Sequence, residues 1–345
     1  MGMGLLRWVT GATLGALALA CGGAASEPGA AGEAELDADD WSSEWRRLAL
    51  PGSGLELVGI TRTPGGWHLF SSTGSENYAY RSSDGVRWTR VQLPDDRARL
   101  TGIAYGGGRY VIVGHTQGAG HLIWVSTDGE TWQAPPVTQG FGLDGVQFVE
   151  GRFFSWGLDI WSSQDAESWV RSRREDIYFP AQVAFGAGRY LLVGVGVPQL
   201  SSDGVSWSSA PIDCSLPSAC ISDVDEGTPF NQFRNVLFAE GHFYLSRLRS
   251  PDGQTWEEVA GPAPTSYLSG RFVRRNFAFT PDPEITLEAW PEGGTPQPID
   301  ILPAPEVELP SDGNIPESLD YSWSDGLDCT SARCVLLGNE LYLIP

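Results

Sequence analysis

The sequence predicts an all-β protein made of repeated four-stranded units, and two recurring phrases lead to this prediction. A tryptophan recurs seven times in nearly the same local context, at spacings between 34 and 49 residues. A second phrase, two β-rich runs joined by a glycine turn, precedes most of these tryptophans. No period of 3.6 residues is convincing beyond the first twenty residues, and the 43 Gly and 24 Pro residues argue against long helices.

The phrase that ends in tryptophan predicts a hairpin turn. Asp bonds to its own backbone in turns, and the Gly that usually follows it tolerates positive φ. We therefore expect the Asp to accept backbone N–H groups and the Trp to pack between adjacent sheets, so that both are structural. The five plain copies are Asp84 with Trp88, Asp128 with Trp132, Asp165 with Trp169, Asp203 with Trp207, and Asp252 with Trp256. Two copies that match the phrase only in part (the worn copies) surround Trp45 and Trp290.

The second phrase predicts another hairpin in each unit. Short β-rich runs flank a glycine turn, which is the sequence signature of two paired strands. Each unit then holds about four strands, and four-stranded units of roughly 40–50 residues are typical of β-propeller blades. The clearest copies are centred on Gly108-Arg109, Gly151-Arg152, Gly188-Arg189 and Gly241-His242.

The two ends of the chain complement each other. The Trp45 strand has no hairpin before it, and the segment 334–344 has hairpin character but no tryptophan strand after it. We expect both to share a seventh blade with the Trp45 strand outermost, which closes the ring and removes an open sheet edge. Six blades, with residues 41–51 elsewhere, is the alternative. A proline-rich stretch at 291–318 interrupts the repeat, as an extended connection or as a loop over one face.

The repeat resembles the Asp box, or BNR repeat, of sialidase-type β-propellers over residues 41–345. It has one residue fewer between Asp and Gly, and similar phrases occur in photosystem II assembly-factor-like propellers. The resemblance implies a possible sialidase-like glycoside hydrolase, which needs an arginine triad, a late tyrosine and an early Phe/Tyr-Arg-Ile-Pro motif. That motif is absent, and Arg62 is a poor match to it. Further arginines and a tyrosine that could serve are Arg247, Arg249, Arg274, Arg275 and Tyr321, whereas Arg271 is explained by the repeat.

Residues 1–20 are expected to be a lipoprotein signal peptide. Arg7 precedes an apolar run that is too short for a stable membrane span. The run ends in Leu17-Ala-Leu-Ala-Cys21, which resembles a bacterial lipobox with Cys21 as the lipidated residue. The alternative is an ordinary secretory signal cleaved after Ala20. Residues 21–40 are acidic and nearly free of large apolar groups, so we expect a disordered tether, and Gly22 favours the outer membrane by resemblance.

Four further cysteines remain in the exported chain. Their close spacing favours two local disulfides, Cys214–Cys220 and Cys329–Cys334, among three possible pairings. The spacings do not fit a zinc site.

The formal net charge of −21 argues against nucleic acid and against anionic lipid surfaces as partners. Membrane contact is expected through the lipid anchor alone, and we expect a monomer. Asp223 and Asp225 loosely resemble the start of a calcium loop but lack its remaining ligands. No catalytic residue, metal or cofactor is predicted. The sequence favours a non-catalytic envelope lipoprotein that binds a protein or a glycan, with the sialidase-like enzyme as the alternative.

Overall fold

The computed structural model of the chain is all-β, as the sequence predicts. It describes residues 45–48, 56–302, 326–329, 334–337 and 341–343, and these contain thirty strands and no helix. The gaps within 56–302 are 73–76, 84–88, 94–97, 117–119, 136–143, 158, 173–175, 223–228, 234, 269, 279–283 and 300. None of the described segments is a helix that could cross a bilayer.

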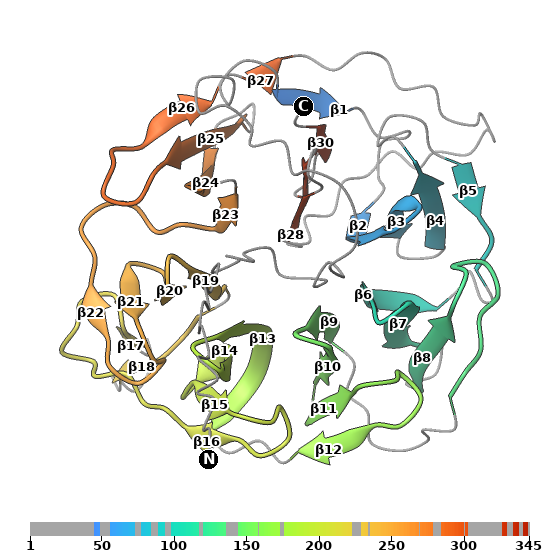
Figure 1. The fold of residues 1–345 in the computed structure, drawn as a ribbon, viewed down its shortest axis with the longest axis horizontal. Helices are drawn as coiled ribbons and strands as arrows, with labels where there is room; N and C mark the ends of the chain where they lie inside the picture. The colour runs from blue at the N-terminus through green and yellow to red at the C-terminus, as the bar shows by residue number, and fades with distance from the viewer. Residues whose placement is uncertain are drawn as a thin grey trace, which may run out of the picture.

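The sheets form a ring, and in the sheets of three or four consecutive strands the first strand lies nearest the centre (Figure 1). Six sheets use three or four consecutive strands, and their arrangement in a ring makes the fold a β-propeller. Six blades is the alternative that the sequence left open. Blade 1 contains β2 (Glu56–Thr63), β3 (Gly66–Ser72), β4 (Asn77–Ser82) and β5 (Thr89–Val91). Blade 2 contains β6 (Arg99–Gly106), β7 (Arg109–His115) and β8 (His121–Ser126). Blade 3 contains β9 (Gly145–Val149), β10 (Arg152–Trp156), β11 (Ile160–Ser163) and β12 (Val170–Ser172).

The other three blades follow the same order. Blade 4 contains β13 (Ile177–Gly186), β14 (Arg189–Gly196), β15 (Gln199–Ser201) and β16 (Ser208–Ser209). Blade 5 contains β19 (Leu237–Ala239), β20 (His242–Leu245), β21 (Leu248–Ser250) and β22 (Glu257–Glu258). Blade 6 contains β23 (Ser266–Leu268), β24 (Arg271–Ala278), β25 (Glu284–Trp290) and β26 (Gln297–Ile299). A small hairpin of β17 (Ile221–Ser222) and β18 (Pro229–Phe230) lies between blades 4 and 5 in the chain.

A further sheet joins both ends of the chain. Its order is β27 (Ile301–Leu302), β1 (Trp45–Leu48), β30 (Leu341–Leu343), β29 (Cys334–Leu337) and β28 (Gly326–Cys329). In Figure 1 this sheet lies between blade 6 and blade 1. The expected pairing of the Trp45 strand with the C-terminal segment is present, with Arg46 opposite Leu343. We keep the seven-bladed count as a prediction, because it depends on counting this mixed sheet as a complete blade.

Two expectations about this region are wrong in detail. The N-terminal strand is not outermost, because β27 pairs with it in parallel on its outer side. The stretch 291–318 does not simply interrupt the repeat, since its first part supplies β26 and β27.

The worn copy of the repeat at Trp290 is also shifted from its expected place. Trp290 lies opposite Phe272 across β24 and β25. In blade 2 the corresponding pair is Tyr110 and Ser126, the serine that opens the turn. Trp290 therefore occupies the position of the serine, and the worn turn is the segment 291–296 that follows it. Gly293 there has a φ of 71°, close to the 75° of Gly129 in blade 2.

The core lies between neighbouring blades. One cluster combines Phe70 from blade 1 with Ile112 and Trp124 from blade 2, and Trp132 packs against it. Equivalent clusters fill the spaces between each following pair up to blade 6. The aromatic and aliphatic residues of the repeat thus hold adjacent sheets together by removing apolar surface from water.

The antiparallel blades give the ring two different faces. The turns that join the third strand to the fourth lie on one side, which we call the Ser-Asp face after the serine and aspartate of the repeat. The turns that join the second strand to the third, together with the connections between blades, lie on the other side, which we call the connection face.

Candidate functional site

The aspartates of the repeat accept hydrogen bonds in a recurring turn. Asp128 Oδ1 accepts the N–H groups of Glu130 and Thr131 at 2.8 and 2.7 Å and the hydroxyl of Ser126 at 2.8 Å. The Ser126 hydroxyl in turn accepts the N–H of Gly129 at 2.9 Å. These donors, led by Thr131 and Glu130, stabilise the carboxylate and hold the pKa of Asp128 well below its usual range.

The same geometry recurs at Asp165, Asp203 and Asp252. Donated backbone N–H groups lower the pKa of Asp203 to about 2, and they lower the pKa of Asp165 and Asp252 as well. Asp84 and Trp88 lie outside the described residues. Each of the three carboxylates accepts hydrogen bonds from its own turn, the arrangement that a structural role requires.

Each turn also rests on the preceding blade. A Cβ on Gly129 of blade 2 would meet His68 Nε2 of blade 1 at 2.8 Å, and the φ of Gly129 is 75°. The equivalent Gly204 of blade 4 lies against Arg152 of blade 3. In the turn of blade 3, Glu167 pairs with Arg109 of blade 2 at 2.6 Å. The arginine of the second phrase therefore contacts the turn of the next blade, which explains why the two phrases recur together.

The arginines considered for a sialidase-like site are paired with carboxylates. Arg247 contacts Glu258 at 2.9 Å, and Arg249 contacts Glu257 at 2.6 Å. Arg274 forms an ion pair with Glu288, its cross-strand partner. Arg275 is also in β24, but its side chain lies outside the described residues, as do Arg62 and Tyr321. The structure thus does not bring these three described arginines together on one anion.

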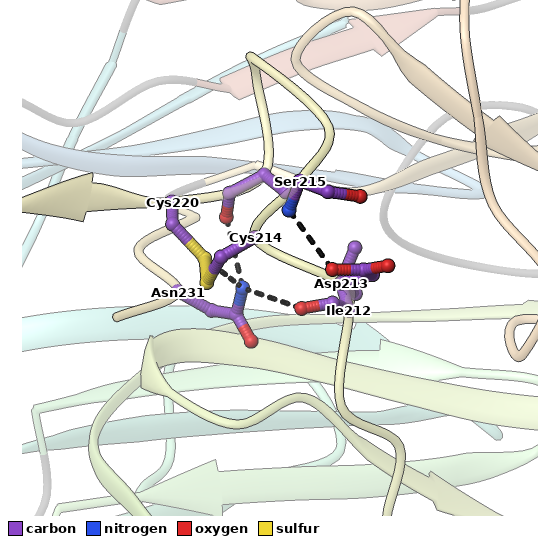
Figure 2. The surroundings of a disulfide bond; sticks show 7 residues. Ile212, Asp213, Cys214, Ser215, Cys220 and Asn231 are labelled. Atoms are coloured by element: carbon purple, nitrogen blue, oxygen red, sulfur yellow. Dashed lines mark hydrogen bonds between the residues drawn. A yellow bond between two sulfur atoms is a disulfide. The ribbon is translucent and has the colours of Figure 1, made fainter. Parts of the chain in front are cut away.

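Residues 210–236, between β16 and β19, form an insertion in the repeat. This insertion is part of the connection between blades 4 and 5, on the connection face. The predicted disulfide Cys214–Cys220 is present there (Figure 2). The buried amide of Asn231 donates to the Ala219 carbonyl at 2.9 Å and to Cys220 Sγ at 3.0 Å. The insertion also contributes Ile212, Ala219 and Phe233 to the core between blades 4 and 5. This packing attaches the described part of the insertion to blades 4 and 5.

Polar contacts attach the insertion to blade 5 as well. Ser218 donates its N–H and its hydroxyl to Glu258 of β22 at 3.2 and 2.5 Å. Arg247 donates to the same hydroxyl at 3.2 Å. The second predicted disulfide stays a prediction: Cys329 and Cys334 are direct cross-strand partners, but their side chains lie outside the described residues. The same holds for Asp223 and Asp225.

The inner strand of blade 4 contains two register shifts. One of them, between Pro180 and Gln182, has counterparts at Leu100/Gly102 in blade 2 and Leu57/Gly59 in blade 1. The other lies between Ile177 and Phe179, at Tyr178, and has no counterpart among the described inner strands. β-Bulges re-aim side chains and are common next to functional sites.

Tyr178 is 64% exposed, although it lies on an inner strand. Within the described residues, Val170 on the outer strand β12 is the other exposed large hydrophobic side chain, at 46%. Ile177 pairs with Gly196, next to the turn between β14 and β15, so Tyr178 is at the connection face. We call the residues 176–180 together with the described insertion residues 210–222 and 229–233 the Tyr178 surface. Tyr178 carries no signal in the sequence that predicts a functional role.

Side-chain amides tie the inner strands of blades 3, 4 and 5 together. Gln147 of β9 accepts the N–H of Val183 in β13, and Gln182 of β13 accepts the N–H of Val236, each at 2.8 Å. These amides satisfy backbone donors along the inner edge, where no further strand pairs. The Tyr178 surface is therefore built on strands that are fixed relative to each other.

No metal site is present in the part of the chain that the structure describes. No group of three or more His, Cys, Asp or Glu side chains there could hold an ion. On the connection face, His115 lies near His121, with ring centroids 5.6 Å apart, and its Nε2 is 3.8 Å from Asp144 Oδ1. Burial, partly offset by Asp144, lowers the pKa of His115.

The comparisons with known proteins agree on the fold. No protein-family model matches the chain, and no curated protein matches its sequence. The solved structure of YCF48 bound to D1 peptide is similar to this chain with a TM-score of 0.51 and 15% identity, and the match covers 89% of this chain and 96% of the YCF48 chain. Virginiamycin B lyase from Staphylococcus aureus gives 0.53 and 10% identity, over 87% and 98%. At these identities the likeness shows a β-propeller and no more.

Proposed function

We propose that this protein is a non-catalytic scaffold of the bacterial cell envelope that binds a protein partner at the Tyr178 surface. The observation that carries the proposal is the extra bulge at Tyr178, which the repeat does not require and which exposes a large aromatic side chain. Tyrosine is enriched at interface positions that contribute most of the binding energy. A bulge that served packing alone would bury this ring.

The insertion beside Tyr178 supports binding of a macromolecule. It is held by the disulfide, by Asn231 and by the contacts to Glu258, so its exposed residues Asp213 and Ser215 are presented on a rigid frame. A preorganised surface loses little conformational entropy when a partner binds. The likeness to YCF48 bound to D1 peptide favours a protein over a glycan as the ligand.

The location follows from the N-terminal expectations. Lipidation at Cys21 would anchor the protein in the envelope, and residues 21–40 would act as the acidic tether that separates the ring from the membrane. This arrangement leaves the whole ring accessible to a partner. Both segments lie outside the described residues.

Site-specific photo-crosslinking in the source bacterium tests the proposal. A benzoylphenylalanine replaces Tyr178 in one strain and Val170 in another, since Val170 is exposed on the outer rim of a different blade. We expect a discrete protein adduct from position 178 and not from position 170. The partner, once purified, should bind the wild-type chain and bind Tyr178→Ala more weakly. Equal adducts from both positions, or a partner whose affinity ignores Tyr178, would contradict the proposal.

The sialidase-like hydrolase stays the alternative because of the repeat itself. It predicts cleavage of a fluorogenic sialoside by the purified chain, with loss of activity in Arg274→Ala. Binding without cleavage supports the scaffold, and turnover that depends on Arg274 supports the enzyme.

A further inference from the structure

The disulfide-closed insertion is connected to the Tyr178 bulge by consecutive hydrogen bonds. Asn231, which donates to Cys220 Sγ, accepts the N–H of Gly196 through its backbone carbonyl at 2.8 Å. The next residue, Val197, donates its N–H to the carbonyl of Asp176 at 2.7 Å. Asp176 directly precedes the bulged segment. The hydrogen-bonded connection from the disulfide to Asp176 thus runs through Asn231, Gly196 and Val197.

Little free space exists along this connection. Gly196 has a φ of 106°, and a Cβ at this position would lie 2.3 Å from the Asp176 carbonyl oxygen. Phe233 of the insertion donates its N–H to Gly194 at 2.9 Å, so the insertion pairs with β14 like an additional strand. Asp176 itself has a φ of 59°, a conformation that needs support from its surroundings. A displacement of Asn231 would therefore be transmitted to Asp176.

The two cysteines of the disulfide differ in exposure. Cys214 is exposed, whereas Cys220 is half-buried and accepts the hydrogen bond from Asn231. A thiolate of an external dithiol would attack Cys214 Sγ, form a mixed disulfide and release Cys220 as a thiolate. The Asn231 amide donates to that sulfur and stabilises the leaving group. The second thiol of the dithiol then displaces Cys214. The dithiol loses two electrons and becomes a disulfide, and both cysteines end as thiols.

We propose that Cys214–Cys220 is a redox-sensitive clamp that positions the Tyr178 bulge for binding. The proposal rests on the proposed function of the Tyr178 surface and adds its regulation. In the oxidised form, Asn231 is held against Ala219 and Cys220, and the bulge is fixed. In the reduced form, the segment 212–220 separates from Asn231, and the segment 176–180 loses its support.

Hydrogen exchange of the full chain, followed by mass spectrometry, tests the clamp without a ligand. Cys329→Ser/Cys334→Ser serves as the background, so that reduction acts only on Cys214 and Cys220. With dithiothreitol we expect backbone amides of 176–182 to exchange about fivefold faster, as expected for the loss of one net hydrogen bond. The inner strand β9 in the neighbouring blade should not change. Additional replacement of Cys214 and Cys220 by Ser should reproduce the fast exchange and remove the response to dithiothreitol.

Two outcomes would overturn the clamp. Faster exchange confined to 212–220, with 176–182 unchanged, would make the disulfide a local staple. Faster exchange throughout the ring would make it a general stabiliser. Hydrogen exchange needs no partner, so a negative result refutes the clamp alone. The proposed function fails on a different result, namely a Tyr178→Ala variant that binds the partner as tightly as the wild-type chain.

Discussion

Replacing Asp128 by alanine removes the acceptor at the centre of one Ser-Asp turn. The side chain lies at the surface, so the change leaves no cavity in the core. What it removes is one carboxylate oxygen that accepts two backbone N–H groups and a serine hydroxyl. The stability effect of this variant therefore measures the turn itself.

The magnitude follows from these three hydrogen bonds. A hydrogen bond to a charged group contributes about 1.5–3 kcal/mol when shielded, and less when water can replace the acceptor. Glu130 and Thr131 are exposed, so water satisfies part of their need. We expect Asp128→Ala to lower the free energy of unfolding by about 1–3 kcal/mol. For a ring of this size the melting temperature should fall by roughly 2–8 °C.

Asp213→Ala is the matched control for this prediction. Asp213 is also exposed and accepts one backbone N–H, from Ser215 at 2.9 Å. Urea unfolding followed by tryptophan fluorescence should show that Asp128→Ala costs clearly more than Asp213→Ala. Because the folded pKa of Asp128 is lowered, the difference should be present above pH 4 and vanish as the pH falls through the lowered value. A cost no larger than that of Asp213→Ala, or a pH-independent one, would refute the reasoning.

Three further predictions concern the ring and its anchor. Burial and the charge of Arg81 lower the pKa of His68 to about 4, so stability should fall by up to about 3 kcal/mol as the pH drops from 6.5 to 4, a dependence absent in His68→Gln. Deleting residues 22–40 should leave urea unfolding unchanged, whereas deleting residues 22–51 should destabilise the ring and cause aggregation, because β27 and β30 lose β1. Cys21→Ala should move the protein from membrane pellets to the soluble fraction; unchanged pelleting would exclude lipidation.

Features that depend on local chemistry could be predicted from the sequence. Asp128 and Gly129 specify their turn within a few residues, and Cys214 is close enough to Cys220 that a local disulfide was the favoured pairing. The pairing of the Trp45 strand with the C-terminal segment could also be predicted, because each end lacked what the other supplied. The strand β27 could not be predicted from the sequence, because it consists of two residues in a proline-rich stretch that carries no strand signal.

Tyr178 was missed because a bulge is a property of two paired strands. Its position depends on the register between β13 and β14, which the residues around it do not specify. The available signal was length: β13 has ten residues, whereas β6 has eight. The turn near Trp290 was predicted in the wrong place for a related reason. The prediction took Trp290 as the tryptophan that ends the repeat, whereas the register places Trp290 at the position of the serine that opens the turn.

Binding of the partner through Tyr178 is tested most directly by the ratio of two dissociation constants. With the crosslinked partner purified, calorimetry compares Tyr178→Ala and Val170→Ala with the wild-type chain. We predict that Tyr178→Ala weakens binding by about 30-fold or more, as expected for an interface residue worth about 2 kcal/mol. Val170→Ala should leave the dissociation constant unchanged. Equal affinities for all three chains would contradict the account.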